Sequence, residues 1–283
     1  MSASAAGQAG DFLAGMAASS RARSAAAQAK LPERELRARL RDAPAAPRLR
    51  LDAFDLIAEV KLRSPAVGLL KEAATEDVGE RVCAYARAGA AAVSILTEPS
   101  RFDGSIADLE TGAHALQALA VPAMRKDFIV DGYQVLEGRR AGAGGVLAIL
   151  RMIPRTELEQ VIDTALEQHM FVLLEAFDEA DIALARDLVD SRRAHRDLLL
   201  VGVNSRDLVT LKVVPGRLDA LADKLPRDVK RVAESGVATA EDAARVARHG
   251  YDLALVGSAL MSAPDPAALA RDMLAAGRKA RGA

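Results

Sequence analysis

The chain has 283 residues, of which 51% are hydrophobic and 27% are charged, enough for one large core or two modest domains. Its formal net charge is only -1, whereas a general nucleic-acid or membrane surface normally leaves a basic excess. We therefore expect a globular protein with no nucleic-acid or membrane partner, in which any anionic ligand is bound locally.

Three features of the sequence favour a cytoplasmic location. The single cysteine, Cys83, excludes an internal disulfide and suits a reducing compartment. The first residues lack the basic start and apolar core of a secretory signal, and no apolar run approaches the ~20 residues of a membrane helix. The helical context of Cys83 favours a buried packing thiol over a nucleophile.

Residues 1–50 differ from the rest of the chain. Residues 12–36 are rich in alanine and arginine, and the segment 42–47 interrupts them with two prolines. We expect one or two extra helices that cover one end of the following domain. A partly disordered tail is the alternative for residues 1–10.

Residues 51–283 alternate short runs of Val, Ile and Leu with longer amphipathic stretches, several of which end near glycine. Thr75-Glu76-Asp77, Ile153-Pro154 and Thr239-Ala240-Glu241-Asp242 have the residues of helix N-termini. The alternation and the short connections predict one α/β domain, a single (β/α)8 TIM barrel over residues 51–283 with an N-terminal helical extension over residues 1–50. The eight expected strands are 56–60, 92–96, 122–125, 145–149, 171–175, 199–203, 230–234 and 253–256.

Five of these apolar runs end in polar side chains, which are costly at the end of a buried strand unless they are paired or used. All strands of a barrel end at the same mouth, so the five ends predict one shared polar site. Ion pairs that only fix strand ends are the alternative for any single residue. The polar residues are Glu59 and Lys61, Lys126, Glu175, Asn204, and Glu234 with Ser235.

Amines and carboxylates at this density can act as general acids and bases, because neighbouring charges move their pKa values apart. A lysine donates a proton most readily near neutral pH when its pKa is lowered. We expect Lys61 and Lys126 to lower one another's pKa.

Two further segments indicate phosphate binding. Glu234-Ser235-Gly236-Val237 and Val256-Gly257-Ser258-Ala259 follow the seventh and eighth strands, and both offer backbone N–H groups ahead of a helix. Ser64-Pro65 and Arg206 are placed to close over the rest of a ligand, with the guanidinium able to bind a carboxylate or a phosphate. A pairing of Arg206 with Asp207 or another surface acid is the alternative.

The sequence gives no support for histidine chemistry or for dinucleotide binding. His114, His169, His195 and His249 all lie in or beside predicted helices, which disfavours histidine catalysis and a histidine metal site. No glycine motif for a dinucleotide follows a strand. Phe102 and Phe128 either line a slot for a flat ring or belong to ordinary packing.

Together the motifs resemble those of the indole-3-glycerol-phosphate synthase family over roughly residues 10–275. The matching segments occur in one collinear order: Ile57-Ala58-Glu59-Val60-Lys61 with Ser64-Pro65, Phe102-x-Gly104-Ser105, Arg125-Lys126-Asp127-Phe128, Leu174-Glu175, Asn204-x-Arg206-Asp207-Leu208, Glu234-Ser235-Gly236 and Val256-Gly257-Ser258-Ala259-Leu260-Met261.

The resemblance implies a barrel enzyme of tryptophan biosynthesis, a carboxy-lyase that needs no cofactor or metal. Its reaction converts 1-(2-carboxyphenylamino)-1-deoxyribulose 5-phosphate to indole-3-glycerol phosphate, with loss of CO2 and water. It implies that Lys126 is the general acid, that Lys61 and Glu175 share the later proton transfers in an undecided order, and that Glu59, Asn204, Glu234 and Ser235 orient the lysines and the sugar. The implied substrate contacts are Ser64, Phe102, Phe128, Leu147, Arg206, Leu208, Gly236, Val256, Gly257 and Ser258.

The sequence departs from the family in the first loop, which reads Lys61-Leu62-Arg63-Ser64-Pro65-Ala66-Val67-Gly68 and lacks a hydroxyl and an amine that the family usually has. Asn204-Ser205 also replaces the more usual Asn-Asn. Two other functions stay open: a paralogous barrel that acts on a modified anthranilate-derived ribulose phosphate, and a catalytically idle phosphate-binding barrel. We expect a phosphorylated small-molecule substrate and a monomer or weak homo-oligomer.

Overall fold

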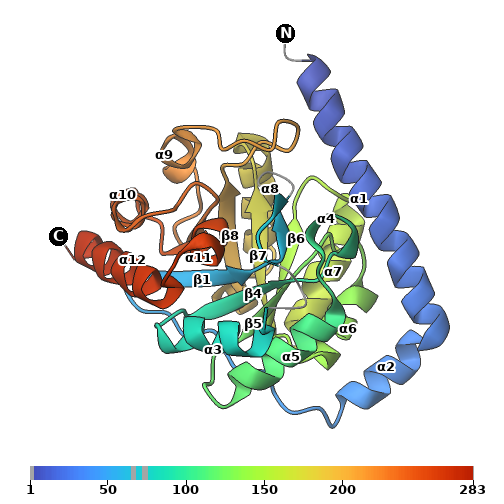
Figure 1. Ribbon diagram of the computed structural model, residues 1–283. Coiled ribbons are helices and arrows are strands. Elements are labelled where there is room, and N and C mark those ends of the chain that lie inside the picture. Colours follow the sequence, from blue (N-terminus) through green and yellow to red (C-terminus); the bar gives the residue numbers. More distant parts are fainter. Residues whose placement is uncertain (1–2, 65–67, 72–75, 283) are drawn as a thin grey trace.

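Eight parallel strands close into a barrel in this computed structural model, which describes residues 3–64, 68–71 and 76–282, with side chains from Phe12 onward (Figure 1). Strand β1 pairs with both β10 and β4, so the sheet has no free edge. The predicted fold class is confirmed. The barrel strands are β1 (Asp55–Val60), β4 (Ala92–Leu96), β5 (Ala123–Lys126), β6 (Gly145–Ile149), β7 (Phe171–Ala176), β8 (Leu199–Asn204), β9 (Lys230–Glu234) and β10 (Leu253–Val256).

The strands are the apolar runs of the sequence, and their ends differ from the expected ones by at most one residue. Side chains on both faces of β1, β6 and β7 are buried, as the continuous apolar character requires when helices cover the outside and packed layers fill the inside. Burial of each Val, Leu or Ile contributes about 1.5–3 kcal/mol. This core fixes the strand ends from which the polar side chains project.

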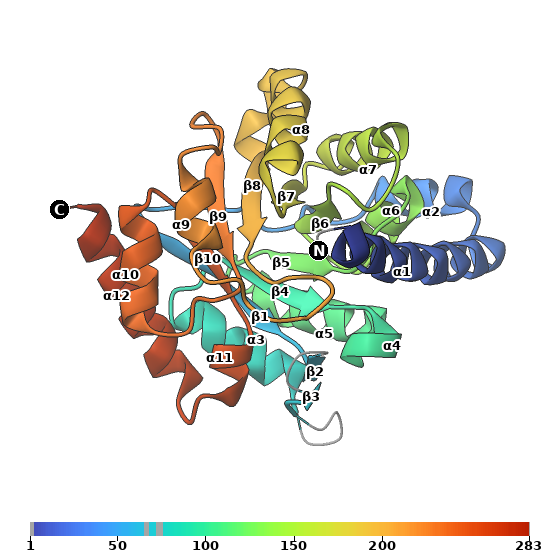
Figure 2. The ribbon, with the colours of Figure 1, turned by 90° about the horizontal axis from the view of Figure 1, so that it is seen from above.

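Helices surround the barrel on its outer face (Figure 2). Most begin at a side-chain cap: Asp77 accepts from the Glu80 N–H, and Thr239 and Asp242 form a capping box. Pro154 precedes α7 as expected, whereas Thr75 lies outside the described residues. The outer helices are α3 (Val78–Arg87), α4 (Pro99–Phe102), α5 (Ile106–Gln117), α6 (Gly132–Arg140), α7 (Arg155–Glu167), α8 (Glu179–Asp190), η1 (Arg193–Leu198), α9 (Arg217–Ala222), α10 (Ala240–Arg248), α11 (Ser258–Ser262) and α12 (Pro266–Arg281).

Two helices precede the barrel, α1 (Ala3–Lys30) and α2 (Glu33–Leu40). Helix α1 runs along the outside of the barrel past α6 and α4, so residues far apart in sequence lie side by side (Figures 1 and 2). Leu13 and Met16 of α1 are buried in the main core. The chain is helical from Ala3, so the alternative of a partly disordered tail does not hold for residues 3–10, and Met1 and Ser2 lie outside the described residues.

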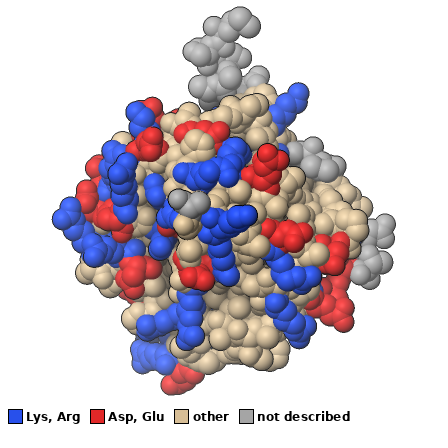
Figure 3. Space-filling view, turned by 90° about the vertical axis from the view of Figure 1, so that its left-hand side faces the viewer, with Lys and Arg blue, Asp and Glu red and all other residues tan. Residues whose placement is uncertain are grey.

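Acidic and basic side chains are interspersed on the face that carries α10 and α12 (Figure 3). Arg278 pairs with Asp55 at 2.8 Å and Arg281 with Asp252 at 2.6 Å, which ties α12 to the barrel. Among the described residues, no helix combines the length and apolar character that crossing a membrane requires. Cys83 lies on α3 as expected, and its thiol faces the carbonyl of Ala115, but the residue is half-buried and not buried as we expected.

Candidate active site

A cavity of about 310 Å³ opens at the carboxyl ends of the barrel strands. All seven residues expected to be catalytic line it, together with nine of the ten expected substrate contacts. Val256 is the exception: it is buried in β10 and its neighbours Leu255 and Gly257 line the cavity instead. The residues brought together as expected are Lys126, Lys61, Glu175, Glu59, Asn204, Glu234, Ser235, Ser64, Phe102, Phe128, Leu147, Arg206, Leu208, Gly236, Gly257 and Ser258.

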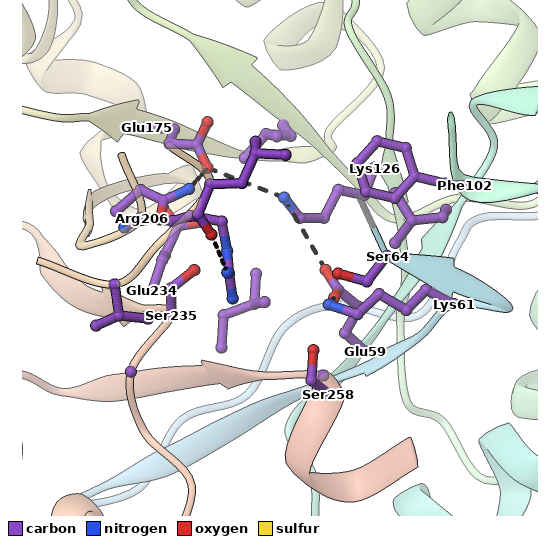
Figure 4. Close-up of a pocket in the computed structure, with 18 of the residues that line it drawn as sticks. Glu59, Lys61, Ser64, Phe102, Lys126, Glu175, Arg206, Glu234, Ser235 and Ser258 are labelled. Atoms are coloured by element: carbon purple, nitrogen blue, oxygen red, sulfur yellow. Dashed lines mark hydrogen bonds and ion pairs between the residues drawn. The ribbon is translucent and has the colours of Figure 1, made fainter. Parts of the chain in front are cut away.

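Lys126 lies between two carboxylates from different strands (Figure 4). Its Nζ is 3.9 Å from Glu59 Oε2 and 3.9 Å from Glu175 Oε1. Burial alone would lower the pKa of Lys126, but Glu175, Glu59 and Glu234 outweigh it and raise the pKa above its ordinary value of 10.5. Our expectation of a lowered pKa is therefore wrong for Lys126, which stays an ammonium ion because carboxylates outnumber the amines around it.

Glu59 and Lys61 are two residues apart at the end of β1 and point into the same cavity (Figure 4). Lys61 Nζ donates to Glu59 Oε1 at 2.6 Å. Burial would raise the pKa of Glu59, but Lys61 and Lys126 lower it below 4.5. This carboxylate is charged at neutral pH and serves as the counter-ion of both lysines.

Glu175 is held by an amide from the neighbouring strand. Asn204 Nδ2 donates to Glu175 Oε1 at 2.8 Å, and Asn204 Oδ1 accepts from the Arg206 N–H at 2.9 Å. The Asn204 side chain is therefore fixed in orientation, with its amide NH2 group toward Glu175. This arrangement holds Glu175 facing Lys126.

Glu234 has different surroundings. It is buried, and neither of its carboxyl oxygens has a hydrogen-bond partner among the described residues. Burial and the neighbouring Glu175 carboxylate raise the pKa of Glu234 well above 4.5. Glu234 therefore favours the neutral acid, unlike Glu59.

Arg206 reaches the cavity without an ion pair to Asp207. Its Nη1 donates to the Leu211 carbonyl at 2.7 Å, whereas Asp207 accepts from the N–H groups of Val209 and Thr210 within its own loop. The alternative pairing of Arg206 with Asp207 is therefore wrong. The guanidinium keeps donors for a ligand.

The two glycine segments line one side of the cavity. Ser235 has φ 62° and Gly236 has φ 74°, so both adopt the left-handed conformation, which is costly for serine. The Ser258 hydroxyl is buried and has no partner among the described residues. Backbone strain and an unpartnered buried hydroxyl at the same wall are features of a ligand site.

An apolar wall also lines the cavity. Phe102 and Phe128 both line the cavity, with ring centroids 6.3 Å apart. Phe12, from helix α1, packs edge-on against Phe128 at 6.0 Å and lines the cavity too. We did not expect Phe12, because nothing in the local sequence of α1 relates it to Phe128, which lies far along the chain.

A buried ionic network lies behind Lys126 and was also not foreseen. Both guanidinium nitrogens Nη1 and Nη2 of Arg23, on α1, donate to Asp127, the residue that follows Lys126. Arg125, on the other side of Lys126, pairs with Asp127 at 3.3 Å and donates to Thr97. Burial would raise the pKa of Asp127, but Arg23 and Arg125 lower it to about 2. The N-terminal helix thereby fixes the backbone that carries Lys126.

The changed first loop is described only in part. Ser64 lies in the short strand β2 (Arg63–Ser64), which pairs with β3 (Gly68–Leu69), and Arg63 pairs with Asp103 at 2.6 Å. Pro65, Ala66 and Val67 lie outside the described residues. Among the described residues, no group of three His, Cys, Asp or Glu side chains is arranged to hold a metal ion.

Comparisons with known proteins show the family of the chain. The sequence model of the family described as indole-3-glycerol phosphate synthase matches residues 14–273. The chain belongs to this family. It is 41% identical to the indole-3-glycerol phosphate synthase of a Nocardioides species, over 80% of this chain and 82% of that protein. It is 38% identical to indole-3-glycerol phosphate synthase 1 of Streptomyces coelicolor, over 88% of this chain and 87% of that protein.

Solved structures outside the indole-3-glycerol phosphate synthase family share the fold. A thiamine phosphate pyrophosphorylase from Pyrococcus furiosus has a TM-score of 0.57 at 14% identity, covering 81% of this chain and 97% of that one. A 3-hexulose-6-phosphate synthase from Salmonella typhimurium has a TM-score of 0.59 at 19% identity, covering 79% of this chain and 98% of that one. At these identities the likeness shows the barrel alone.

Proposed function

We propose that this cavity closes the indole ring of 1-(2-carboxyphenylamino)-1-deoxyribulose 5-phosphate, giving indole-3-glycerol phosphate, CO2 and water. The chain is an enzyme of the indole-3-glycerol phosphate synthase type, a carboxy-lyase of tryptophan biosynthesis. The observation that carries the proposal is the convergence of two lysines, the carboxyl groups of Glu59 and Glu175 and an aromatic wall on one cavity.

The substrate's flat ring lies against the apolar wall. Phe12, Phe102 and Phe128 form this wall, and Leu147 and Leu208 extend it. The wall holds the aryl carbon toward the strand ends, where Lys126 meets the sugar ketone. Arg206 and Lys61 supply positive charge for the substrate carboxylate.

Lys126 is the general acid of ring closure. As the aryl carbon attacks the ketone, negative charge develops on the ketone oxygen, and an ammonium ion held in place stabilises it and donates a proton. The raised pKa of Lys126 keeps that proton on the amine before the substrate binds. Glu59 and Glu175 hold the amine between them.

Two steps follow ring closure. Loss of CO2 returns its bonding electrons to the ring and restores aromaticity without proton transfer. Dehydration needs one donor for the leaving hydroxyl and one acceptor for the C–H proton beside the nitrogen. We assign the donor role to Lys61 and the acceptor role to Glu175. The whole reaction consumes two donated protons, returns one, and takes one from solvent.

The phosphate lies against Gly236, Gly257, Ser258 and Ser64. Supporting this placement are the left-handed backbone at Ser235 and Gly236 and the unpartnered hydroxyl of Ser258 among the described residues. Backbone N–H groups of this kind form anion-binding concavities, and phosphates bind after strands seven and eight in barrels of this type.

We also propose residues 51–283 as the catalytic domain and residues 1–50 as an extension that completes it through Phe12 and Arg23. A cytoplasmic monomer or weak homo-oligomer without a nucleic-acid or membrane partner is consistent with the net charge of -1 and the single cysteine.

Fluorescence detection of indole-3-glycerol phosphate formed from the anthranilate adduct tests the proposal. We expect turnover of the unmodified adduct at the highest kcat/KM in a panel that includes ring-substituted adducts. Faster turnover of a substituted adduct would instead support the paralogous barrel. Absence of turnover on the whole panel would support the idle barrel.

A further inference from the structure

Gly202 has no side chain, and the Glu234 carboxyl fills the space that this leaves at β8. Gly202 is buried, and a β-carbon placed on it would lie 2.2 Å from Glu234 Oε1 and 3.0 Å from Leu173 Cδ1. Both distances are shorter than normal van der Waals contact, and the distance to Glu234 Oε1 is far too short for any real β-carbon. The glycine is needed for space and not for its conformation, because its φ is not positive.

The register of the sheet places this space beside Glu175. Gly202 and Glu175 are cross-strand partners on β8 and β7. Neighbouring strands are about 4.8 Å apart, and partnered residues point to the same side of the sheet. The Glu234 carboxyl, which lies over Gly202, is therefore next to the Glu175 side chain.

Glu234 has no cationic partner in the part of the chain that the structure describes. Among the described residues, no amine or guanidinium nitrogen lies within ion-pair distance of its carboxyl, and neither oxygen accepts a hydrogen bond. The charged groups that act on it are Glu175 from β7, Lys126 from β5 and Glu59 from β1. Two buried carboxylates side by side cannot both ionise without a large cost, and a shared proton removes that cost.

We infer that Gly202 is a positioning residue: the space it leaves seats the Glu234 carboxyl beside Glu175, so that the two carboxyl groups hold one proton between them. The protonated member donates to the other, and Asn204 donates to Glu175 from the second side at 2.8 Å. Glu175 is thereby held as the single base of the pair.

The shared proton also lets the site recover Lys126, and this part rests on the proposed function. After ring closure Lys126 is a neutral amine. When Glu175 takes the C–H proton of the substrate, the pair holds two protons. Transfer of one of them over the 3.9 Å to Lys126 Nζ restores the ammonium ion and returns the pair to one proton. Lys61 is reprotonated from solvent.

A double-mutant cycle with Gly202→Ala and Glu234→Ala tests the positioning role. Gly202→Ala should lower kcat about 100-fold with KM nearly unchanged, because it displaces the Glu234 carboxyl. In the Glu234→Ala background, where only Leu173 Cδ1 still limits the space, the same change should alter kcat by less than about twofold. Equal losses in both backgrounds would overturn the inference.

Gly145→Ala is the matched control for overpacking a strand. A β-carbon there would lie 2.3 Å from the Phe171 ring, away from the cavity. It should lower the melting temperature while kcat of the folded enzyme stays within about twofold. A 100-fold loss of kcat in this variant would show that any overpacked strand glycine disables the site, and would contradict a specific role for Gly202.

Infrared spectroscopy tests the shared proton without substrate. At neutral pH the wild-type protein should show a protonated carboxyl band that Glu234→Gln removes and Gly202→Ala shifts or removes. The inference fails if Glu234→Gln removes no such band, or if Gly202→Ala leaves it unchanged. Because neither spectrum depends on turnover, failure of the proposed function would leave this result intact, and the reverse also holds.

Discussion

The two sides of the cavity place a buried carboxyl group by the same means and give it opposite charge states. Glu59 lies over Gly257, where an added β-carbon would be 2.2 Å from its Oε1, just as Glu234 lies over Gly202. Glu59 has two lysines beside it and a lowered pKa, whereas Glu234 has Glu175 beside it and a raised pKa. The backbone fixes where each carboxyl lies, and its neighbours decide whether it carries charge.

Lys126 is shared by the two sides, so removing it should have the largest effect. Lys126→Ala should lower kcat by at least about 1000-fold, because the ketone oxygen then has no proton donor, while ligand binding remains detectable by calorimetry. Lys224→Ala, which removes an exposed amine near Glu179, should leave kcat unchanged. Turnover of Lys126→Ala at the wild-type rate would refute its role.

Replacing Glu59 by an uncharged residue should remove the negative charge from its side of the cavity, which then resembles the Glu234 side. Glu59→Gln should lower kcat about 100-fold, since Lys61 and Lys126 lose their common counter-ion. Glu59 helps to raise the pKa of Lys126, so its loss should lower that pKa and move the alkaline limb of the kcat profile to lower pH. A limb that stays in place or moves to higher pH would contradict this account. Glu179→Gln is the exposed control.

Arg23 lies outside the cavity and holds Lys126 between the two sides through its contact with Asp127. Arg23→Ala leaves the buried Asp127 without its two-pronged partner, and should lower kcat about tenfold and the free energy of unfolding by about 3 kcal/mol. Arg21→Ala, on the same helix, removes only the exposed pair with Glu157 and should cost at most about 1 kcal/mol with kcat unchanged. Equal effects of the two variants on kcat would show that α1 does not position Lys126.

A substitution of Glu234, on the neutral side, should have the smallest effect. It should appear in the pH dependence of the free energy of unfolding. Because folding raises the pKa of Glu234, its contribution to stability is fully present below pH 4.5 and is lost as pH rises through the raised value. Glu234→Gln, which has no such titration, should therefore gain on the wild type as pH rises above 4.5, by about 1.4 kcal/mol per pH unit at most. Chemical unfolding across this range measures it, and a constant difference would contradict a raised pKa.

Much of this molecule follows from local sequence. The strand ends were predictable because each continuous apolar run needs a core on both faces, and the convergence of Lys61, Lys126 and Glu175 followed from barrel geometry. Phe12 and Arg23 could not be placed, because their contacts with Phe128 and Asp127 join segments about a hundred residues apart.

The charge states of the buried side chains could not be predicted from the local sequence either. The pKa of Lys126 depends on the distances to three carboxyl groups from three other strands, and no spacing in the sequence gives these distances. Val256 was misplaced for a simpler reason: alternate strand residues point to opposite sides, and the cavity receives Leu255 and Gly257.

The most direct test of decarboxylating ring closure at this cavity uses adduct labelled in its carboxylate carbon, with labelled CO2 and indole-3-glycerol phosphate followed together. For the wild-type protein we predict that the two appear at the same rate and in equal amounts, and that Lys126→Ala abolishes both. Labelled CO2 without the indole product, or neither product from a protein that binds the adduct, would contradict the account.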